Sequence, residues 1–396
     1  MQAVELKPNV YWVGGIDWDI RNFHGYKTWR GTTYNAYLII DEKITLIDTV
    51  KHYLCDELIE RIRSVVDPKK IDYVISNHVE MDHSGSLPKI MKLCKNATII
   101  TSPKGQKGLE KHYEQDWKFQ TVKSGEQISI GKRSLQFVHI PMVHWPDSMV
   151  SFCPEEKILF PNDAFGQHIA GSHRFDDQIG WSLLKEEAAK YYANIVMPYG
   201  PQVQNALKAL SNLDIEMIAP SHGIIWRSYI DEIIEEYKKW STFQKEKSAV
   251  IIYDSMWGST EKMAYALLAG FEKAKVPVAL RNLKENDISD IVTDVLSAGV
   301  VAVGSPTLNN SMLPSVGGFL TYLVGLRPKN KIGFVFGSYG WGGQAVGDIK
   351  KSLEPLSWDY PSDEEKINYI PGEADLQKLK EIGFSLGKKL EKNDSN

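Results

Sequence analysis

Cysteine is scarce in this chain of 396 residues, and its scarcity excludes several kinds of site. Only Cys55, Cys94 and Cys153 are present, far apart and without a Cys-x-x-Cys pair. Neither a disulfide framework nor an iron–sulfur or rubredoxin-type centre, which would need four thiolates, is therefore expected. We expect the three cysteines to be small buried apolar residues. If the protein transfers electrons, it must receive them from another molecule.

Other features that the sequence lacks limit the cellular location and the kinds of partner that we expect. No apolar run approaches the length of a membrane span, and residues 1–5 lack the basic and apolar parts of a signal peptide. The formal net charge is -4 and no block of basic residues occurs, so neither nucleic acid nor a membrane is expected as a partner. These features predict a cytoplasmic enzyme.

Two domains are expected from the length and from a change of pattern. Residues 1–246 contain short strands grouped with helices, whereas residues 249–396 alternate strand and helix. A charged stretch at residues 244–248 follows a helical segment and is predicted to connect the two.

The first half mixes short strands with helices. We predict strands at residues 10–14, 34–40, 44–48, 71–76, 97–101, 134–140, 149–153, 157–160 and 216–219. Helices are predicted at residues 55–65, 87–94, 181–196, 201–213 and 229–243. Periodicity alone shows no more than a mixed α and β class.

The second half predicts a doubly wound parallel sheet of five strands. The strands are expected at residues 249–253, 276–282, 299–303, 331–336 and 367–370. Intervening helices are expected at residues 261–273, 288–298 and 313–325, after residue 336, and from residue 375. The last residues, 388–396, are expected to fray.

Residues 77–85, directly after the predicted strand 71–76, carry the densest chemistry in the chain. Four metal-binding side chains, His78, Glu80, Asp82 and His83, fall within six residues. In an extended or turning loop alternate residues point the same way, so His78, Glu80 and Asp82 are expected to converge on one point. His83 would face a second point nearby. The pattern favours two metal ions over one.

Three further candidate ligands follow apolar runs later in the chain. They are His144, Asp163 and His222. A metal site assembled across a scaffold needs ligands on several strand-end loops. For any one of these segments alone, a polar surface loop with scattered histidines is the simpler interpretation. It does not explain why four such segments each follow an apolar run.

The first loop of the second half predicts a phosphate site. It consists of Ser255, Met256, Trp257, Gly258, Ser259 and Thr260 and leads directly into a helix. Hydroxyl groups and backbone N–H groups at a helix N-terminus bind phosphate without a cationic side chain. The loop is neither a Walker A loop nor a Gly-x-Gly-x-x-Gly fingerprint, which favours a mononucleotide monophosphate over ATP or NAD.

Two more loops follow strands of the same predicted sheet. One contains Ser305, Pro306, Thr307, Leu308, Asn309 and Asn310, and the other Ser338, Tyr339, Gly340, Trp341, Gly342 and Gly343. Ligands of such sheets bind where loops leave the carboxyl ends of the strands. Polar atoms for ring edges and aromatic faces for stacking predict a flavin. The alternative is a set of Gly/Ser turns without a ligand.

The run at residues 78–83, together with His144, Asp163 and His222, resembles the metallo-β-lactamase fold in its flavodiiron branch. The zinc hydrolases of that fold usually carry His-x-His-x-Asp-His, and Glu80 replaces their second histidine. More oxygen donors shift the preference from zinc towards iron. The resemblance covers nearly the whole chain. It implies an N-terminal αββα sandwich and a C-terminal flavodoxin-like domain that binds FMN, although Trp257 departs from the commonest flavodoxin loop.

The resemblance also implies roles for single residues. His78, Glu80 and His144 would bind one iron ion, Asp82, His83 and His222 the other, and Asp163 would bridge them. His24 and Tyr191 would line the gas pocket, and His168 would support the ligands. The remaining histidines, His52, His112, His139 and His173, are expected to be uninvolved.

The implied activity is the reduction of dioxygen to water, of nitric oxide to nitrous oxide, or of both. Metal ions in such pairs sit about 3.5–4 Å apart, which suits a diatomic molecule. The implied partners are an external electron donor, such as rubredoxin or a deazaflavin coenzyme, and a second copy in a head-to-tail homodimer, with a tetramer as the alternative assembly. The alternatives are a dinuclear zinc hydrolase with an appended flavodoxin-like module and an inactive electron carrier. The donor and the preferred gas stay open.

Overall fold

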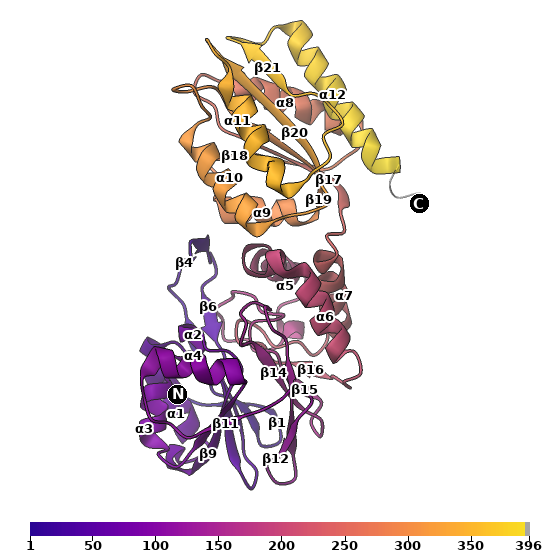
Figure 1. The fold of residues 1–396 in the computed structure, drawn as a ribbon. Helices are drawn as coiled ribbons and strands as arrows, with labels where there is room; N and C mark the ends of the chain where they lie inside the picture. The colour runs from indigo at the N-terminus through magenta and orange to yellow at the C-terminus, as the bar shows by residue number, and fades with distance from the viewer. Residues whose placement is uncertain (393–396) are drawn as a thin grey trace. The chain divides into compact units, whose positions relative to one another are not determined.

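The computed structural model describes residues 1–392, and its chain divides into two units (Figure 1). The first unit comprises Met1–Tyr191 and Tyr199–Ser241, and the second comprises Tyr192–Pro198 and Thr242–Asn396. The second unit therefore includes a short segment from the middle of the chain. In that segment, Asn194 Nδ2 donates to the backbone oxygen of Ser289 at 3.1 Å, and the Tyr322 hydroxyl donates to Asn194 Oδ1 at 2.7 Å.

Two sheets form the centre of the first unit. The larger has the order β1-β2-β7-β8-β9-β10-β11 and the smaller β12-β13-β14-β15-β16. The larger sheet contains β1 (Val4–Lys7), β2 (Val10–Trp12), β7 (Tyr37–Ile39), β8 (Ile44–Ile47), β9 (Ile71–Ser76), β10 (Thr98–Thr101) and β11 (Phe119–Thr121). The smaller contains β12 (Gln127–Ser129), β13 (Ser134–His139), β14 (Met149–Cys153), β15 (Ile158–Phe160) and β16 (Met217–Ile218). Their apolar faces share one core, in which the rings of Tyr37 and Phe160 are 5.1 Å apart.

Helices cover the outer faces of both sheets (Figure 1). Beside the larger sheet lie α1 (Cys55–Arg63), α3 (Leu87–Leu93) and α4 (Pro103–Tyr113), and beside the smaller α5 (Trp181–Tyr191), α6 (Gly200–Leu210) and α7 (Ile230–Ser241). In α1, Leu58, Ile59 and Ile62 are buried at helical spacing, which gives one apolar stripe. The implied αββα sandwich is confirmed.

Several elements of the first unit differ from the prediction. The helix expected at residues 181–196 ends at Tyr191 and continues as a π-helical turn, Tyr192–Val196. Pro198 prevents a regular α-helix beyond this turn, because proline has no N–H to donate and its ring clashes with the carbonyl of the residue four positions earlier. The helix α4, the strand pair β3 (Gly15–Asp17) with β6 (Thr32–Tyr34), and the hairpin β4 (Asn22–Phe23) with β5 (Tyr26–Lys27) were not predicted.

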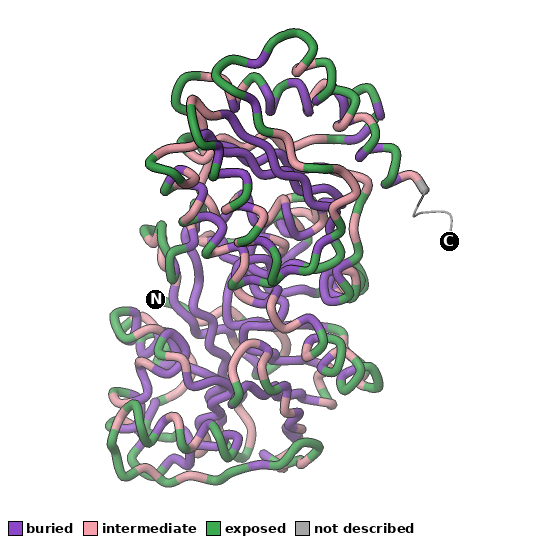
Figure 2. The backbone as a smooth tube through the Cα atoms, turned by 45° about the horizontal axis from the view of Figure 1, so that its top comes forward, coloured by how far each residue is buried: buried purple, intermediate pink, exposed green. Residues whose placement is uncertain are grey.

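The second unit is the expected doubly wound sheet. Its five parallel strands have the order β18-β17-β19-β20-β21. They are β17 (Glu246–Tyr253), β18 (Val278–Asn282), β19 (Ala298–Gly304), β20 (Ile332–Tyr339) and β21 (Glu365–Asn368). The helices are α8 (Ser259–Lys273), α9 (Ile288–Ser297), α10 (Pro314–Leu326), α11 (Gln344–Leu353) and α12 (Glu373–Lys392). Figure 2 shows the buried strands at the centre of this unit.

The boundaries of this unit need three corrections. β17 starts at Glu246, so part of the stretch expected to connect the domains is strand. β20 continues to Tyr339, three residues past the expected end, which turns two predicted loop residues into strand residues. α12 runs to Lys392, so the expected fraying at 388–392 is wrong, and residues 393–396 lie outside the described residues.

The cysteines and the apolar segments were also subjects of expectations from composition. The three cysteines are buried and free, as expected. Within residues 1–392, no helix has the length and apolar character that crossing a membrane requires.

Candidate metal centre and phosphate loops

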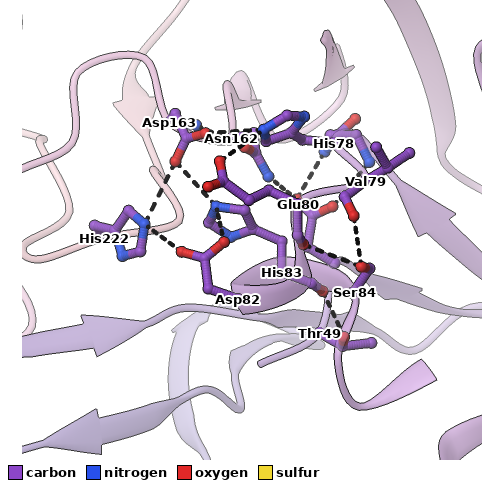
Figure 3. A network of polar contacts seen from close by, with 12 residues as sticks. Thr49, His78, Val79, Glu80, Asp82, His83, Ser84, Asn162, Asp163 and His222 are labelled. Carbon is purple, nitrogen blue, oxygen red and sulfur yellow. Dashed lines mark hydrogen bonds and ion pairs between the residues drawn. The ribbon is translucent and has the colours of Figure 1, made fainter. Parts of the chain in front are cut away.

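The structure brings all seven predicted metal ligands together at one end of the strands of the first unit. His78 and Glu80 follow β9, His144 lies between β13 and β14, and Asp163 follows β15. The remaining three are Asp82 and His83 in the short helix α2 (Met81–Ser84), and His222 after β16. Figure 3 shows most of them converging.

The ligand atoms form two groups. One group is His78, Glu80, His144 and Asp163, and the other is Asp82, His83 and His222. The candidate ligand atoms in each group lie within 4.8 Å of one another. The extended-loop argument predicted that Asp82 would join His78 and Glu80, and this is wrong. Asp82 lies in α2, which turns the chain by about 100° per residue. It lies instead 3.2 Å, through Oδ2, from Nε2 of His222.

Asp163 lies between the two groups. Its Oδ2 is 3.3 Å from His144 Nε2 and 3.6 Å from His78 Nε2. Its Oδ1 is 3.0 Å from His83 Nε2 and 3.4 Å from His222 Nε2. Ligand atoms bound to one ion at about 2.0–2.2 Å are themselves roughly 3.0–3.6 Å apart. Each carboxylate oxygen of Asp163 therefore has the spacing of a ligand to a different ion.

The polar atoms of the site fit metal ions better than they fit one another. Both carboxylate oxygens of Asp82 and Asp163, both ring nitrogens of His83 and Nε2 of His222 are buried and lack a hydrogen-bond partner among the described residues. Leaving such groups unsatisfied costs several kcal/mol of free energy. Metal coordination removes that cost, because every one of these atoms except one ring nitrogen of His83 is a potential ligand.

The charges of the site shift its titration strongly. Burial lowers the pKa of His222, but the carboxylates of Asp163 and Asp82 raise it to about 10. Burial likewise lowers the pKa of His144, and Asp163 and Glu80 raise it to about 9. Metal binding requires neutral imidazoles, so it displaces protons that these carboxylates would otherwise hold on the histidines.

Hydrogen bonds orient two of the ligating imidazoles. His78 Nδ1 is 3.0 Å from Oδ2 of Asp147, which also accepts from the backbone N–H of Val79 at 2.9 Å. His222 Nδ1 is 2.8 Å from the backbone oxygen of Thr33. Each contact fixes the ring so that Nε2 faces the site. Neither Asp147 nor Thr33 was predicted, although Asp147 lies only three residues after His144.

Asp48, a second residue that the sequence did not reveal, connects two ligand loops. It is buried and accepts from the backbone N–H of Asn77 at 2.8 Å and from Asn162 Nδ2 at 3.2 Å. Asn77 precedes His78 and Asn162 precedes Asp163. Asp48 and Asn162 both have a φ of 55°, a left-handed conformation that Asp and Asn tolerate better than most residues.

The residues predicted to line a gas pocket lie against the ligands. His24, at the turn of the β4–β5 hairpin, places Nε2 2.9 Å from Oε1 of Glu80, and this hydrogen bond raises the His24 pKa. The buried rings of Tyr191 and His168 are 5.1 Å apart, and the His168 ring is 4.8 Å from that of His222. Burial lowers the pKa of His168 well below its usual value, so this imidazole is neutral. The histidines expected to be uninvolved, His52, His112, His139 and His173, belong to neither ligand group.

The three predicted phosphate and flavin loops of the second unit leave β17, β19 and β20, which are neighbours in the sheet. In the first loop, Gly258 has a φ of 83° and precedes α8, and its N–H donates to Ser255 Oγ at 3.1 Å. Trp257 is 92% exposed and Met256 40% exposed. The loop is thus a backbone turn before a helix N-terminus, with two exposed apolar side chains beside it.

The other two loops are also built from turns. Asn309 and Asn310 have φ values of 49° and 62°, and the flanking Leu308 and Ser311 exchange backbone hydrogen bonds, as in a type I′ turn. Gly342 and Gly343 have φ values of 85° and 76° and precede α11. Trp341 is 80% exposed.

Three residues predicted to contact the flavin also bond within the loops. The buried hydroxyls of Thr260 and Ser338 are 2.9 Å apart and bond each other. The Ser305 hydroxyl donates to the Pro306 oxygen at 2.8 Å and accepts from the N–H of Leu313 at 3.0 Å. The hydroxyls of these three side chains therefore help to fix the shape of the loops.

Comparisons with known proteins cover both units. Residues 32–223 match the model of the ODP family of β-lactamases, and residues 251–383 match the flavodoxin family.

The chain also matches whole relatives from end to end. It is 47% identical to a nitric oxide reductase of Moorella thermoacetica over 98% of this chain and 99% of that protein. It is similar to the solved rubredoxin oxygen:oxidoreductase of Desulfovibrio gigas, with 44% identity, a TM-score of 0.97 and 100% of both chains covered. The flavodiiron protein of Giardia intestinalis has 37% identity and a TM-score of 0.97 over 99% of this chain and 97% of that one.

Proposed function

The chain belongs to the flavodiiron proteins, and on this premise we propose that it reduces dioxygen to water, nitric oxide to nitrous oxide, or both, with bound FMN and two iron ions. One observation carries the proposal above the others: the two groups of ligand atoms are joined by Asp163, each of whose oxygens lies with one group. A bridged pair of metal ions suits the binding of a diatomic gas.

Iron is favoured over zinc by the donor set. Three carboxylates and four imidazoles face the site, and Glu80 stands where the zinc hydrolases of this fold usually have a histidine. Oxygen donors favour harder metal ions than zinc. The nitric oxide reductase and the rubredoxin oxygen:oxidoreductase that resemble the chain along its whole length support the oxidoreductase over the hydrolase.

The two cofactors explain why both units are needed. When bound, two iron ions can supply two electrons and reduced FMN two more, which equals the four that dioxygen needs and exceeds the two that coupling of nitric oxide needs. His78, Glu80 and His144 would hold the first ion, and Asp82, His83 and His222 would hold the second. Asp163, which lies with both groups, would be shared between the two ions.

The surrounding residues position the gas and its protons. His24 is anchored to Glu80 and presents its ring at the edge of the first ligand group. Tyr191 and neutral His168 form a wall against His222. We assign Tyr191 as a hydrogen-bond donor to a bound gas, because burial raises its pKa well above the usual value and keeps its hydroxyl protonated.

The second unit holds FMN at the three loops after β17, β19 and β20. In its strand order, β17 and β19 flank the reversal point where flavodoxin-like sheets bind their ligand, and β20 is the next strand. The Ser255–Thr260 segment takes the phosphate at the start of α8, and Trp257 and Trp341, both highly exposed, are the candidates for stacking on the ring.

The proposed partners are an electron donor and a second copy of the chain. With three buried cysteines and no thiolate cluster among the described residues, the chain needs an external donor, for which rubredoxin and a deazaflavin coenzyme are candidates. We propose a cytoplasmic, head-to-tail homodimer, in which the FMN of one copy serves the irons of the other. Large exposed apolar side chains on both units support it: Trp18, Trp29 and Met81 on the first, and Trp257, Trp341 and Tyr369 on the second.

Gas consumption with a reduced donor tests the activity. The purified protein, given reduced rubredoxin or a reduced deazaflavin coenzyme, should consume dioxygen without releasing hydrogen peroxide, or convert nitric oxide to nitrous oxide. Comparing initial rates with each gas and each donor would decide between the substrates. Hydrolase activity with bound zinc, and no gas consumption with any donor, would overturn the proposal.

The dimer has its own test by complementation. A variant altered at Ser255 and Ser259 that lacks FMN is mixed with a variant at His78 and Asp163 that lacks the metals. Reassembled heterodimers should recover substantial activity, because one FMN and one intact metal site then meet between the copies. If verified heterodimers remain inactive, transfer occurs within one copy and the head-to-tail arrangement is wrong.

A further inference from the structure

A buried carboxylate precedes the phosphate loop of the second unit. The side chain of Asp254, the residue after β17, is 4% exposed. The backbone N–H of Ser255 donates to its Oδ1 at 2.6 Å, and the Ser315 hydroxyl, in the first turn of α10, donates to its Oδ2. Asp254 therefore connects the first flavin loop with the helix that follows the second.

One cation balances this carboxylate. Nζ of Lys284 lies 3.2 Å from Oδ1 of Asp254 and also donates to the backbone oxygen of Ser255. Within residues 1–392 the structure shows no second ion pair of Asp254. The loop after β18 that carries Lys284 is itself fixed, because the N–H of Leu283 donates to the Tyr253 oxygen at 2.9 Å and the N–H of Lys284 donates to Asn282 Oδ1 at 3.0 Å.

The pairing of Asp254 with Lys284 bears on ligand binding, because the phosphate of the proposed ligand is itself negatively charged. A phosphate monoester carries a charge of about -1.5 to -2 near pH 7. The segment Ser255–Thr260 contains no lysine or arginine, and the residue directly before it is an anion. Repulsion between an uncompensated carboxylate and a phosphate a few residues away would weaken binding by roughly tenfold or more.

We propose that Lys284 is a positioning residue for the flavin phosphate: its ammonium group neutralises Asp254 and holds the Ser255 peptide, so that the loop accepts a dianion. Lys284 lies outside all three flavin loops, and both of its observed partners belong to the Asp254–Ser255 corner. It acts through Asp254 and not by direct contact with the phosphate. The inference rests on the proposed function, because the ligand is FMN.

The test uses the full chain after removal of its flavin. FMN and riboflavin, which lacks the phosphate, are each titrated into the protein, and binding is followed by the change in flavin fluorescence. The variants are Lys284→Met, Lys284→Arg and the double variant Lys284→Met with Asp254→Asn. Lys275→Met is the matched control, since this exposed lysine precedes β18 whereas Lys284 follows it, and it removes the same net charge at the opposite end of the strand.

Lys284→Met should raise the Kd for FMN about tenfold and leave the Kd for riboflavin within twofold. Lys284→Arg and Lys275→Met should both bind FMN as the wild type does. Adding Asp254→Asn should restore most of the FMN affinity that Lys284→Met loses, because the amide keeps the Ser255 hydrogen bond but carries no charge.

Two results would overturn the inference while leaving FMN binding in place. If the double variant binds FMN as weakly as Lys284→Met, Lys284 does not act through Asp254. If Lys284→Met weakens FMN and riboflavin equally, the lysine only supports the fold of the loop. A wild-type protein that binds neither flavin contradicts the proposed function itself, and with it this inference.

Discussion

The metal centre of the first unit and the flavin cradle of the second are built by opposite means. Seven side chains converge on the metal centre, five of them buried, and residues such as Asp48 and Asp147 fix their loops and rings. The cradle consists of turns at strand ends, with glycines and asparagines at positive φ and tryptophans exposed to solvent. Side chains define the first site, and the path of the backbone defines the second.

This difference predicts how each site responds to change. A carboxylate that lies with both ligand groups, as Asp163 does, cannot be replaced by neighbouring groups, because the protein has fixed the geometry around it. A cradle of backbone N–H groups loses only part of its affinity when one residue changes. Substitutions in the metal centre should therefore have larger effects than substitutions in the cradle.

Asp163→Ala should cause the largest effect. It removes the proposed bridging ligand, so we expect loss of most of both metals and a fall in gas reduction of at least a hundredfold. Metal analysis and activity assays on protein purified under identical conditions provide the measurement. Asp214→Ala, at an exposed aspartate that pairs with Lys157, is the control and should retain both metals. Full metal content in the Asp163 variant would refute the bridging role.

Asp147→Asn should weaken one half of the site. Among the seven candidate ligands, the Asp147 side chain bonds to His78, which belongs to the group with Glu80 and His144. Loss of such a partner usually lowers metal affinity 10–100-fold. Metal competition with a chelator should therefore show one weakened ion and one unchanged ion. His222→Ala should show the converse loss. Equal weakening of both ions by Asp147→Asn would contradict the division into two groups.

Gly258→Ala should affect only the cradle, and moderately. With a φ of 83° it strains an alanine by about 1–2 kcal/mol, but the space around it is open, the nearest atom being Glu261 Oε2 at 3.9 Å. We expect FMN to bind about tenfold more weakly and the metal content to stay unchanged.

Gly223→Ala, beside His222, is the matched glycine of the metal centre. An added Cβ there would lie 1.5 Å from Gln167 Oε1, so this variant should lose soluble protein or metal altogether. If Gly223→Ala and Gly258→Ala both have only mild effects, the metal centre is no more rigidly packed than the flavin cradle, and the contrast is wrong.

A buried charge in the second unit predicts a smaller, pH-dependent effect on stability. Burial lowers the pKa of Lys331 from 10.5 to about 7, and the described residues offer it no ion pair. Between about pH 7 and pH 10.5 the unfolded chain binds a proton that the folded chain does not, so stability rises with pH across this window.

Lys331→Met should remove this pH dependence. It should also raise the melting temperature of the second unit by a few degrees below pH 7, where the buried charge is most costly. The gain is limited because the variant loses the hydrogen bond from Nζ to the Leu296 oxygen at 2.9 Å. If the melting temperatures of the variant and the wild type change with pH in the same way from pH 6 to pH 10, this account is wrong.

The same contrast explains which site residues the sequence reveals. Metal ligands are rare residue types in a dense pattern, so the pattern of residues alone predicts all seven. The argument from alternation does not predict that Asp82 and His78 belong to different ligand groups, because the four-residue helix α2 replaces an extended loop. Supporting residues such as Asp48 and Asp147 form no pattern, since one carboxylate in a loop is common and its role depends on a partner far along the chain.

Elements are predictable where one pattern decides them. The strand β9 and the alternating second unit follow from apolar periodicity. The π-helical turn after Tyr191 is not predictable in this way, because its apolar pattern continues that of α5 and only Pro198 breaks it. In the cradle, polar side chains predict ligand contacts for Thr260, Ser305 and Ser338, but their bonds within the loops depend on partners that the sequence does not reveal.

The central claim is that one chain combines a diiron site with one FMN, and a joint count of both cofactors tests it most directly. The full-length protein is purified without oxygen, its metals are measured by elemental analysis, and its flavin is identified and quantified after release. We predict about two iron ions and about one FMN per chain, with the iron lost in Asp163→Ala while the FMN stays. Stoichiometric zinc without iron, or a chain without flavin, would contradict the account.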